Sequence, residues 1–145
     1  MLTFWFGNIS DSGTGPGKYR WTLGLDAPFL LVADQKNVLF EPLFPIVELY
    51  ECLWEWFSSG SVDDFVYTSL EADEEGLVEF RRVGEDKGSV WSAWTLLKTA
   101  PILEWSAIVQ AASGYMRNLE HRIAAEYGIC LSEKVERWSA GKSDL

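Results

Sequence analysis

Alternating apolar and polar positions mark several β-strands in the first forty residues. Residues 2–6 are almost wholly apolar, and residues 19–25 place aromatic or leucine side chains at every second position. Such alternation is typical of a half-buried strand. Residues 29–32 and 38–40 are short apolar runs on either side of a polar turn. This pattern predicts strands at 2–6 and 19–25, followed by a hairpin.

Residues 46–57 repeat their apolar side chains with the period of an α-helix, with Ile46, Leu49 and Leu53 on one side. The opposite side carries Glu48, Glu51 and Glu55. The pattern therefore predicts a helix with an acidic outer stripe.

Three further strands are predicted at residues 65–70, 77–83 and 89–97, where apolar runs are separated by polar turns. Residues 101–127 carry apolar side chains at alternating steps of three and four, which predicts a long helix that Gly128 ends. Gly114 within this helix is expected to permit close packing, and Ser132 to cap a short terminal helix.

These elements together predict an α+β fold: an antiparallel sheet of about five to six strands with two main helices packed on one face. A chain of 145 residues matches the commonest size of one domain, so we expect residues 1–145 to form a single domain.

Charge is distributed unevenly along the chain, whose formal net charge is −10. Residues 34–86 hold 14 acidic and three basic residues, whereas the segments on either side are nearly neutral. Nucleic-acid binding requires Lys and Arg to neutralise phosphates, so a nucleic-acid partner is not expected, and an anionic membrane is disfavoured for the same reason. The acidic segment favours a basic protein partner.

The glycine-rich residues 13–18 superficially match a phosphate-binding loop. Ser12 stands where such a loop has its first glycine, and Tyr19 stands where it has Ser or Thr. Residues 19–25 are also predicted as a strand, not as the helix that follows a phosphate-binding loop. We therefore interpret the segment as a plain loop.

Metal-binding and histidine-dependent chemistry have few candidate residues. His121 is the only histidine and is predicted to face solvent, which excludes a multi-histidine metal site and a His-dependent triad. Cys52 and Cys130 lack the spacing of a zinc site and are predicted to be buried free thiols. The sequence predicts no metal site and no cofactor.

The acidic residues of the middle segment are the candidate partner-binding site, since turns at one end of a sheet can bring them together. Trp54 and Trp56 flank the acidic helix stripe and are the candidate aromatic anchors. The acidic candidates are Glu48, Glu51, Glu55, Asp63, Asp64, Glu71, Asp73, Glu74, Glu75, Glu85 and Asp86.

Several short segments resemble those of bacterial immunity proteins, which are encoded beside contact-dependent-inhibition and other polymorphic toxins. They are Phe40-Glu41, Pro45-Ile-Val-Glu48-Leu, Ser69-Leu-Glu71, Gly76-Leu-Val-Glu-Phe80, Gly88-Ser-Val-Trp91 and Tyr127-Gly-Ile129, together with Asp34. The resemblance implies a cytoplasmic antidote that binds a basic toxin domain, often a nuclease, and blocks it. It implies no enzymatic activity.

An alternative remains open on the sequence: a small-molecule or carbohydrate-binding module, or a minor carboxylate enzyme, that uses the Trp-rich surface. Such an enzyme would need one acid with a raised pKa beside an ionised partner. Glu41 and Glu79, each between apolar neighbours, are its candidates. The first residues have no basic stretch followed by a long apolar run, so we expect a cytoplasmic protein.

Overall fold

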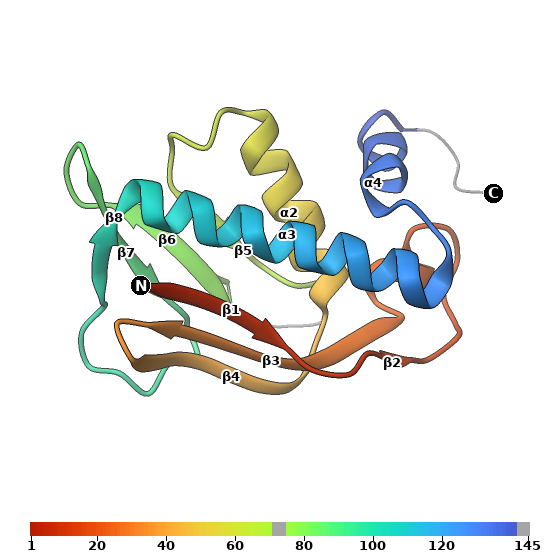
Figure 1. Ribbon diagram of the computed structural model, residues 1–145, viewed down its shortest axis with the longest axis horizontal. Coiled ribbons are helices and arrows are strands. Elements are labelled where there is room, and N and C mark those ends of the chain that lie inside the picture. Colours follow the sequence, from red (N-terminus) through yellow and green to blue (C-terminus); the bar gives the residue numbers. More distant parts are fainter. Residues whose placement is uncertain (71–74, 142–145) are drawn as a thin grey trace.

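The strands of the protein are antiparallel and the helices pack against them, which confirms the predicted α+β class (Figure 1). The computed structural model describes residues 1–70 and 75–141. Within these residues the strands form two four-stranded sheets instead of one sheet of five or six. The first sheet is formed by the four strands before residue 45 and the second by the four strands after residue 64, with a helix between the two sets in the chain.

The first sheet is built around a long central strand, β3 (Leu25–Ala33). It pairs with β4 (Lys36–Phe44) on one side and with β1 (Leu2–Phe6) and the short β2 (Ser10–Asp11) on the other. Burial alternates strictly along β3, as the period of two in a pleated strand requires. The strand and hairpin predicted at 29–32 and 38–40 are therefore present but longer than expected.

The strand predicted at residues 19–25 is wrong. Tyr19–Thr22 forms a one-turn helix, α1, and only Leu25 belongs to a strand. The N–H groups of Leu23 and Gly24 both donate to the carbonyl oxygen of Tyr19, at 3.1 Å. At Gly24 a Cβ would lie 2.2 Å from the carbonyl oxygen of Arg20, so the tight reversal requires glycine there.

The second sheet has the order β5–β6–β7–β8, with each strand antiparallel to the next. Its strands are β5 (Phe65–Tyr67), β6 (Val78–Arg82), β7 (Lys87–Trp91) and β8 (Ile102–Glu104). The last strand replaces the first turn of the helix predicted from residue 101. It does so because β7 offers it hydrogen-bonding groups, and Val90 N–H also donates to Pro101 O at 3.1 Å.

The two main helices are α2 (Ile46–Ser58) and α3 (Trp105–Tyr127), and each contacts strands of both sheets. Figure 1 shows α3 running across the molecule beside β1. Gly128 ends α3 with a left-handed φ of 68°, as predicted. A short helix, α4 (Leu131–Ser139), follows; it begins one residue before Ser132 and without a side-chain cap, so the predicted cap is absent.

Aromatic side chains join the two sheets in one hydrophobic cluster. Phe4 of the first sheet contacts Phe80 of the second, with ring centroids 6.1 Å apart. Phe29 and Phe44 stack at 4.3 Å inside the first sheet. Because the shared core includes residues of both sheets and of α2, α3 and α4, the sheets are held together by packing and not by shared backbone hydrogen bonds.

Gly88 of β7 and Gly114 of α3 differ in the space that a side chain would find there. A Cβ on Gly88 would lie 2.5 Å from the buried Trp105 ring, whereas a Cβ on Gly114 would meet nothing nearer than Arg117 Nη2 at 3.9 Å. The expectation that Gly114 permits close packing is therefore wrong.

We predict that Gly88→Ala lowers the free energy of unfolding by about 1–3 kcal/mol through overpacking. Gly114→Ala should raise it by up to about 1 kcal/mol through helix propensity. Urea denaturation of both variants measures this, and equal signs would contradict the packing described.

The cysteines differ in accessibility, contrary to the prediction that both are buried. Cys130 is exposed, while Cys52 is partly buried. Burial, reinforced by the nearby carboxylates of Glu48, Glu51 and Glu55, raises the pKa of Cys52 to about 12. Its reactive thiolate form is therefore scarce at pH 8.

We predict one fast and one slow thiol in a reaction with a disulfide reagent at pH 8. Cys130→Ser should abolish the fast phase, and Cys52→Ser should leave it unchanged. A fast phase that survives Cys130→Ser would show that Cys52 is accessible and reactive.

Candidate functional site

Three chain segments converge at one end of the second sheet: the α2–β5 loop, the β6–β7 turn and the start of α3. Arg82 Nε donates to Val62 O at 2.9 Å, and Trp105 Nε1 donates to Ser61 O at 3.0 Å. The backbone N–H of Trp105 donates to Asp86 O at 2.7 Å. These bonds fix the three segments relative to one another.

An open depression of about 540 Å³ lies where the segments meet. Its apolar lining comes from Val62, Trp105 and Val109. Its charged lining consists of Glu85, Asp86 and Glu104 together with one cation, Arg82. It thus offers an apolar floor beside carboxylates.

Arg82 holds this end of the molecule together. Its backbone N–H donates to Asp64 Oδ1 at 2.8 Å, and its Nη1 donates to Glu85 O. Its guanidinium also lies over the Trp105 ring, 4.4 Å from the ring centroid. The charge of Arg82 therefore faces backbone oxygens and an aromatic ring, not a side-chain carboxylate.

The carboxylates around the depression form a surface that we call the acidic rim: Asp63, Asp64, Glu85, Asp86 and Glu104. Asp64 has Arg81 at 3.6 Å, and Glu104 has Lys87 at 3.4 Å. Among the described residues, Asp63, Glu85 and Asp86 form no ion pair, and all three are exposed. The acidic rim therefore keeps uncompensated negative charge.

Glu48 does not belong to an acidic outer stripe, and this part of the prediction is wrong. Its side chain is only 5% exposed and accepts hydrogen bonds from Tyr67 Oη at 2.6 Å and from Leu70 N–H at 3.3 Å. Burial and the Glu48 carboxylate raise the pKa of Tyr67, so that its hydroxyl remains a donor. The helical period placed Glu48 away from the core seam, but β5 and the residues after it cover that side of α2.

The other two glutamates of the predicted stripe, Glu51 and Glu55, have different surroundings. Glu51 forms an ion pair with Lys18 at 3.2 Å, which ties α2 to the glycine-rich loop. Glu55 is exposed on the last turns of α2. Sequence spacing brought the three glutamates together on a helical wheel, whereas the fold leaves only Glu55 exposed.

Trp56 is a core residue, so its prediction as a surface anchor is wrong. It is 6% exposed, and its Nε1 donates to Asp63 O at 2.9 Å. Its ring contacts those of Phe57, Phe65, Phe80 and Trp105. Trp54 is partly buried and packs against the core.

Of the predicted hairpin-tip carboxylates, only Glu75 falls within the described residues. Glu71, Asp73 and Glu74 lie outside the described residues. Glu75 is exposed, beside Gly76, whose carbonyl oxygen accepts a hydrogen bond from Ala93 N–H.

Three residues of the site escaped the sequence analysis. Glu104 and Trp105 were assigned to the long helix, and Arg82 was treated as an ordinary strand residue. The bonds from Arg82 to Val62 and from Trp105 to Ser61 join residues 20 and 44 positions apart, which local periodicity cannot detect. The signal that the sequence does contain is the pair Arg81-Arg82, two of the three basic residues in an acidic segment.

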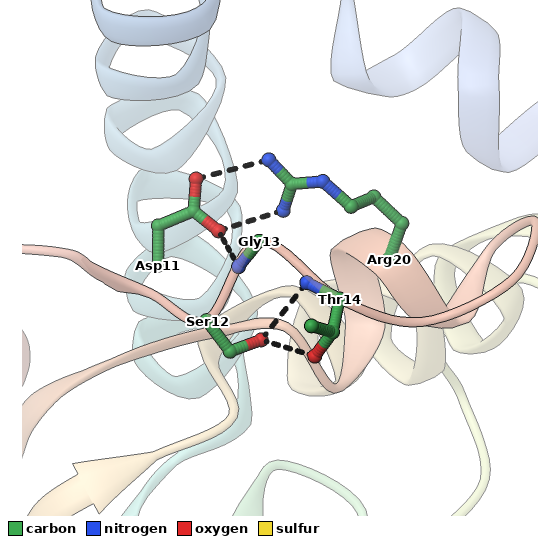
Figure 2. Close-up of polar contacts among 5 residues, drawn as sticks. All are labelled: Asp11, Ser12, Gly13, Thr14 and Arg20. Atoms are coloured by element: carbon green, nitrogen blue, oxygen red, sulfur yellow. Dashed lines mark hydrogen bonds and ion pairs between the residues drawn. The ribbon is translucent and has the colours of Figure 1, made fainter.

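The glycine-rich loop uses its own polar groups internally, as Figure 2 shows. The Asp11 carboxylate accepts two hydrogen bonds from Arg20, at 2.8 and 2.9 Å, and one from Gly13 N–H at 2.8 Å. Ser12 Oγ lies 3.1 Å from Thr14 Oγ1 and accepts a bond from Thr14 N–H. The Asp11 carboxylate thus occupies Gly13 N–H and the Arg20 guanidinium, two donors that could otherwise face a phosphate. Arg20 lowers the pKa of Asp11 accordingly.

Other candidate chemistry is limited in the described residues. His121 is exposed, as predicted. Residues 1–70 and 75–141 contain no group of three or more His, Cys, Asp or Glu side chains arranged to hold a metal ion. Over the same residues, no helix has both the length and the apolar character that crossing a bilayer requires.

Comparison with known proteins gives a family without an assigned function. A family model described as "Domain of unknown function (DUF7878)" matches residues 7–125. No curated protein and no solved structure matches the chain.

Glu48 and Glu55 allow the structural and the surface roles of the α2 glutamates to be separated. We predict that Glu48→Ala lowers the free energy of unfolding by about 3 kcal/mol, because it leaves the Tyr67 hydroxyl and Leu70 N–H without an acceptor. Glu55→Ala should change it by no more than about 0.5 kcal/mol. Chemical denaturation measures both, and a neutral Glu48→Ala would contradict the burial described.

Proposed function

The chain belongs to the DUF7878 family, whose function is unknown. We propose that it is an immunity protein that binds and blocks a basic toxin domain in the cytoplasm. The observation that carries the proposal is the acidic rim, where Asp63, Glu85 and Asp86 are exposed without ion pairs. Resemblance of several sequence segments to immunity proteins of polymorphic toxin systems supports the same conclusion.

Electrostatics supports a cationic protein as the partner. The fold compensates part of its acidic middle segment internally, through the ion pairs that Lys18 and Arg81 form with Glu51 and Glu79, and it buries Glu48 against Tyr67. The acidic rim keeps its charge at the edge of a depression, where field lines are focused and basic partners are attracted. Like charges held together without counter-charges also repel, and a bound Lys or Arg relieves that repulsion.

The depression has the chemistry to receive a long basic side chain. The methylene stem of a Lys or Arg packs on Val62, Val109 and the Trp105 ring, and the charged head reaches Glu85 or Asp86. An arrangement of this kind gives both apolar contact and charge-assisted hydrogen bonds. The depression therefore favours a protein partner that inserts an individual Lys or Arg side chain.

A nuclease is the toxin class that best fits this surface. Nucleases hold nucleic acid with Lys and Arg that neutralise phosphates. An acidic protein that covers those residues competes directly with the substrate. Inhibition in this proposal therefore follows from occupation of the basic substrate path, and it needs no chemical reaction by the immunity protein.

The direct experiment mixes this protein with the toxin domain encoded beside its gene. We expect a one-to-one complex by calorimetry, loss of toxin activity in the complex, and protection of cells that co-express both proteins. Absence of both binding and protection would remove the proposal.

Charge reversal tests the role of the acidic rim. We predict that Glu85→Lys/Asp86→Lys lowers the association rate constant with the toxin domain at least about tenfold at low salt, because electrostatic steering reverses. The matched control is Glu133→Lys/Glu136→Lys on α4, which changes the net charge equally at exposed positions away from the depression. Surface plasmon resonance over a salt series measures both variants. Equal effects of the two double variants would show that net charge, not the acidic rim, governs binding.

A further inference from the structure

The α2–β5 loop, residues 59–64, is held by hydrogen bonds to its backbone carbonyl groups. Three consecutive carbonyl oxygens each accept a hydrogen bond from a side-chain N–H of a helix or strand. The pairs are Ser61 with Trp105 Nε1 at 3.0 Å, Val62 with Arg82 Nε at 2.9 Å, and Asp63 with Trp56 Nε1 at 2.9 Å. Because the donors lie on α3, β6 and α2, the loop is tied to three different elements.

The N–H groups at the start of the loop are bonded as well. Gly60 N–H donates to Phe57 O, and Ser61 N–H donates to Trp56 O, both at 3.0 Å. Gly60 and Ser61 have φ values of 107° and 53°. A positive φ is uncommon for serine and persists only where the surrounding structure holds it. The bonds to both the N–H and the carbonyl oxygen of Ser61 hold it here, so the loop has its conformation before any partner binds.

The side chains in the middle of the loop remain exposed. Val62 is 57% exposed, and Asp63 is exposed without an ion pair within residues 1–70 and 75–141. In Figure 1 the loop runs along the outer margin of the ribbon, from the end of α2 toward β5. The fold therefore fixes this segment through its backbone and leaves an apolar and an anionic side chain for a partner.

We propose that the α2–β5 loop is a preorganised recognition loop that enters the basic substrate cleft of the toxin domain, with Val62 in apolar contact and Asp63 paired with a Lys or Arg of the cleft. This inference rests on the proposed function and identifies the segment that blocks the toxin. A loop that is already rigid loses little conformational entropy when it binds, so a few side-chain contacts give useful affinity.

The chemistry of the loop suits a concave cationic site. Enzyme sites are clefts, and a nuclease lines its cleft with Lys and Arg that neutralise phosphates. Asp63 competes with a phosphate for the same cations, and Val62 fills apolar space beside them. Val62 also lines the depression, and Asp63 belongs to the acidic rim, so the loop is continuous with the surface that attracts the toxin. The depression stays available for a basic side chain at the margin of the cleft.

The first experiment needs no toxin. Amide NMR relaxation of the free full chain measures the backbone order parameters of Ser61, Val62 and Asp63. We expect values equal to those of α2 and β6, which are about 0.85 for rigid backbone. Values clearly below those of the two elements would overturn the proposal, because the loop would not be preorganised.

The second experiment compares Val62→Ala with Val66→Ala in binding to the toxin domain encoded beside the gene. Both valines are exposed, at 57% and 43%, so neither change removes core packing, but Val66 lies on β5 and does not line the depression. We expect Val62→Ala to weaken binding about tenfold, mainly through faster dissociation, and Val66→Ala to weaken it less than about twofold. Surface plasmon resonance measures both, and circular dichroism confirms that each variant is folded.

The third experiment locates the loop on the toxin. Replacement of Val62 by the photo-crosslinking residue p-benzoylphenylalanine should give adducts at toxin residues whose substitution abolishes toxin activity, and the same replacement of Val66 should not. Adducts only elsewhere on the toxin, or equal losses of affinity in the two alanine variants, would overturn the loop proposal while toxin binding stands. A wild type that binds no toxin would instead overturn the proposed function, and this inference with it.

Discussion

The packing of the Trp105 ring against Gly88 is the contact on which the functional end of the molecule depends. Because Gly88 has no side chain, the ring lies directly on β7, where a Cβ would be 2.5 Å away. From that position Trp105 donates to Ser61 O, carries the guanidinium of Arg82 on its face, and contacts Trp56 with ring centroids 6.0 Å apart. One buried side chain thereby joins β7, α3, the α2–β5 loop and the β6–β7 turn. The depression and the acidic rim exist because these segments cannot move apart.

The fold decides which acidic residues of this protein are buried, which are paired and which stay exposed. Fourteen acidic residues lie in positions 34–86, and the fold places them in different environments. Glu48 is buried against Tyr67, Glu51 pairs with Lys18, and Glu79 pairs with Arg81. What remains exposed and unpaired near the depression is a smaller set, Asp63, Glu85 and Asp86. A surface that keeps charge after such internal compensation is better placed to attract a cationic partner than the net charge of the chain alone would suggest.

The sequence by itself determined the α+β class, the antiparallel pairing, α2, most of α3 and the glycine that ends α3, because period and capping are local properties. It also located the charge within one third of the chain. Only the tertiary structure decided that residues 19–22 form a helical turn, that residues 102–104 are a strand, and that two sheets form instead of one. It also decided which acidic residues are exposed. The physical reason is that Glu48, Trp56 and Trp105 are placed by partners far along the chain, and a helical wheel contains no information about a strand that covers it. Burial and pairing, which separate a structural carboxylate from a surface one, are properties of the whole fold.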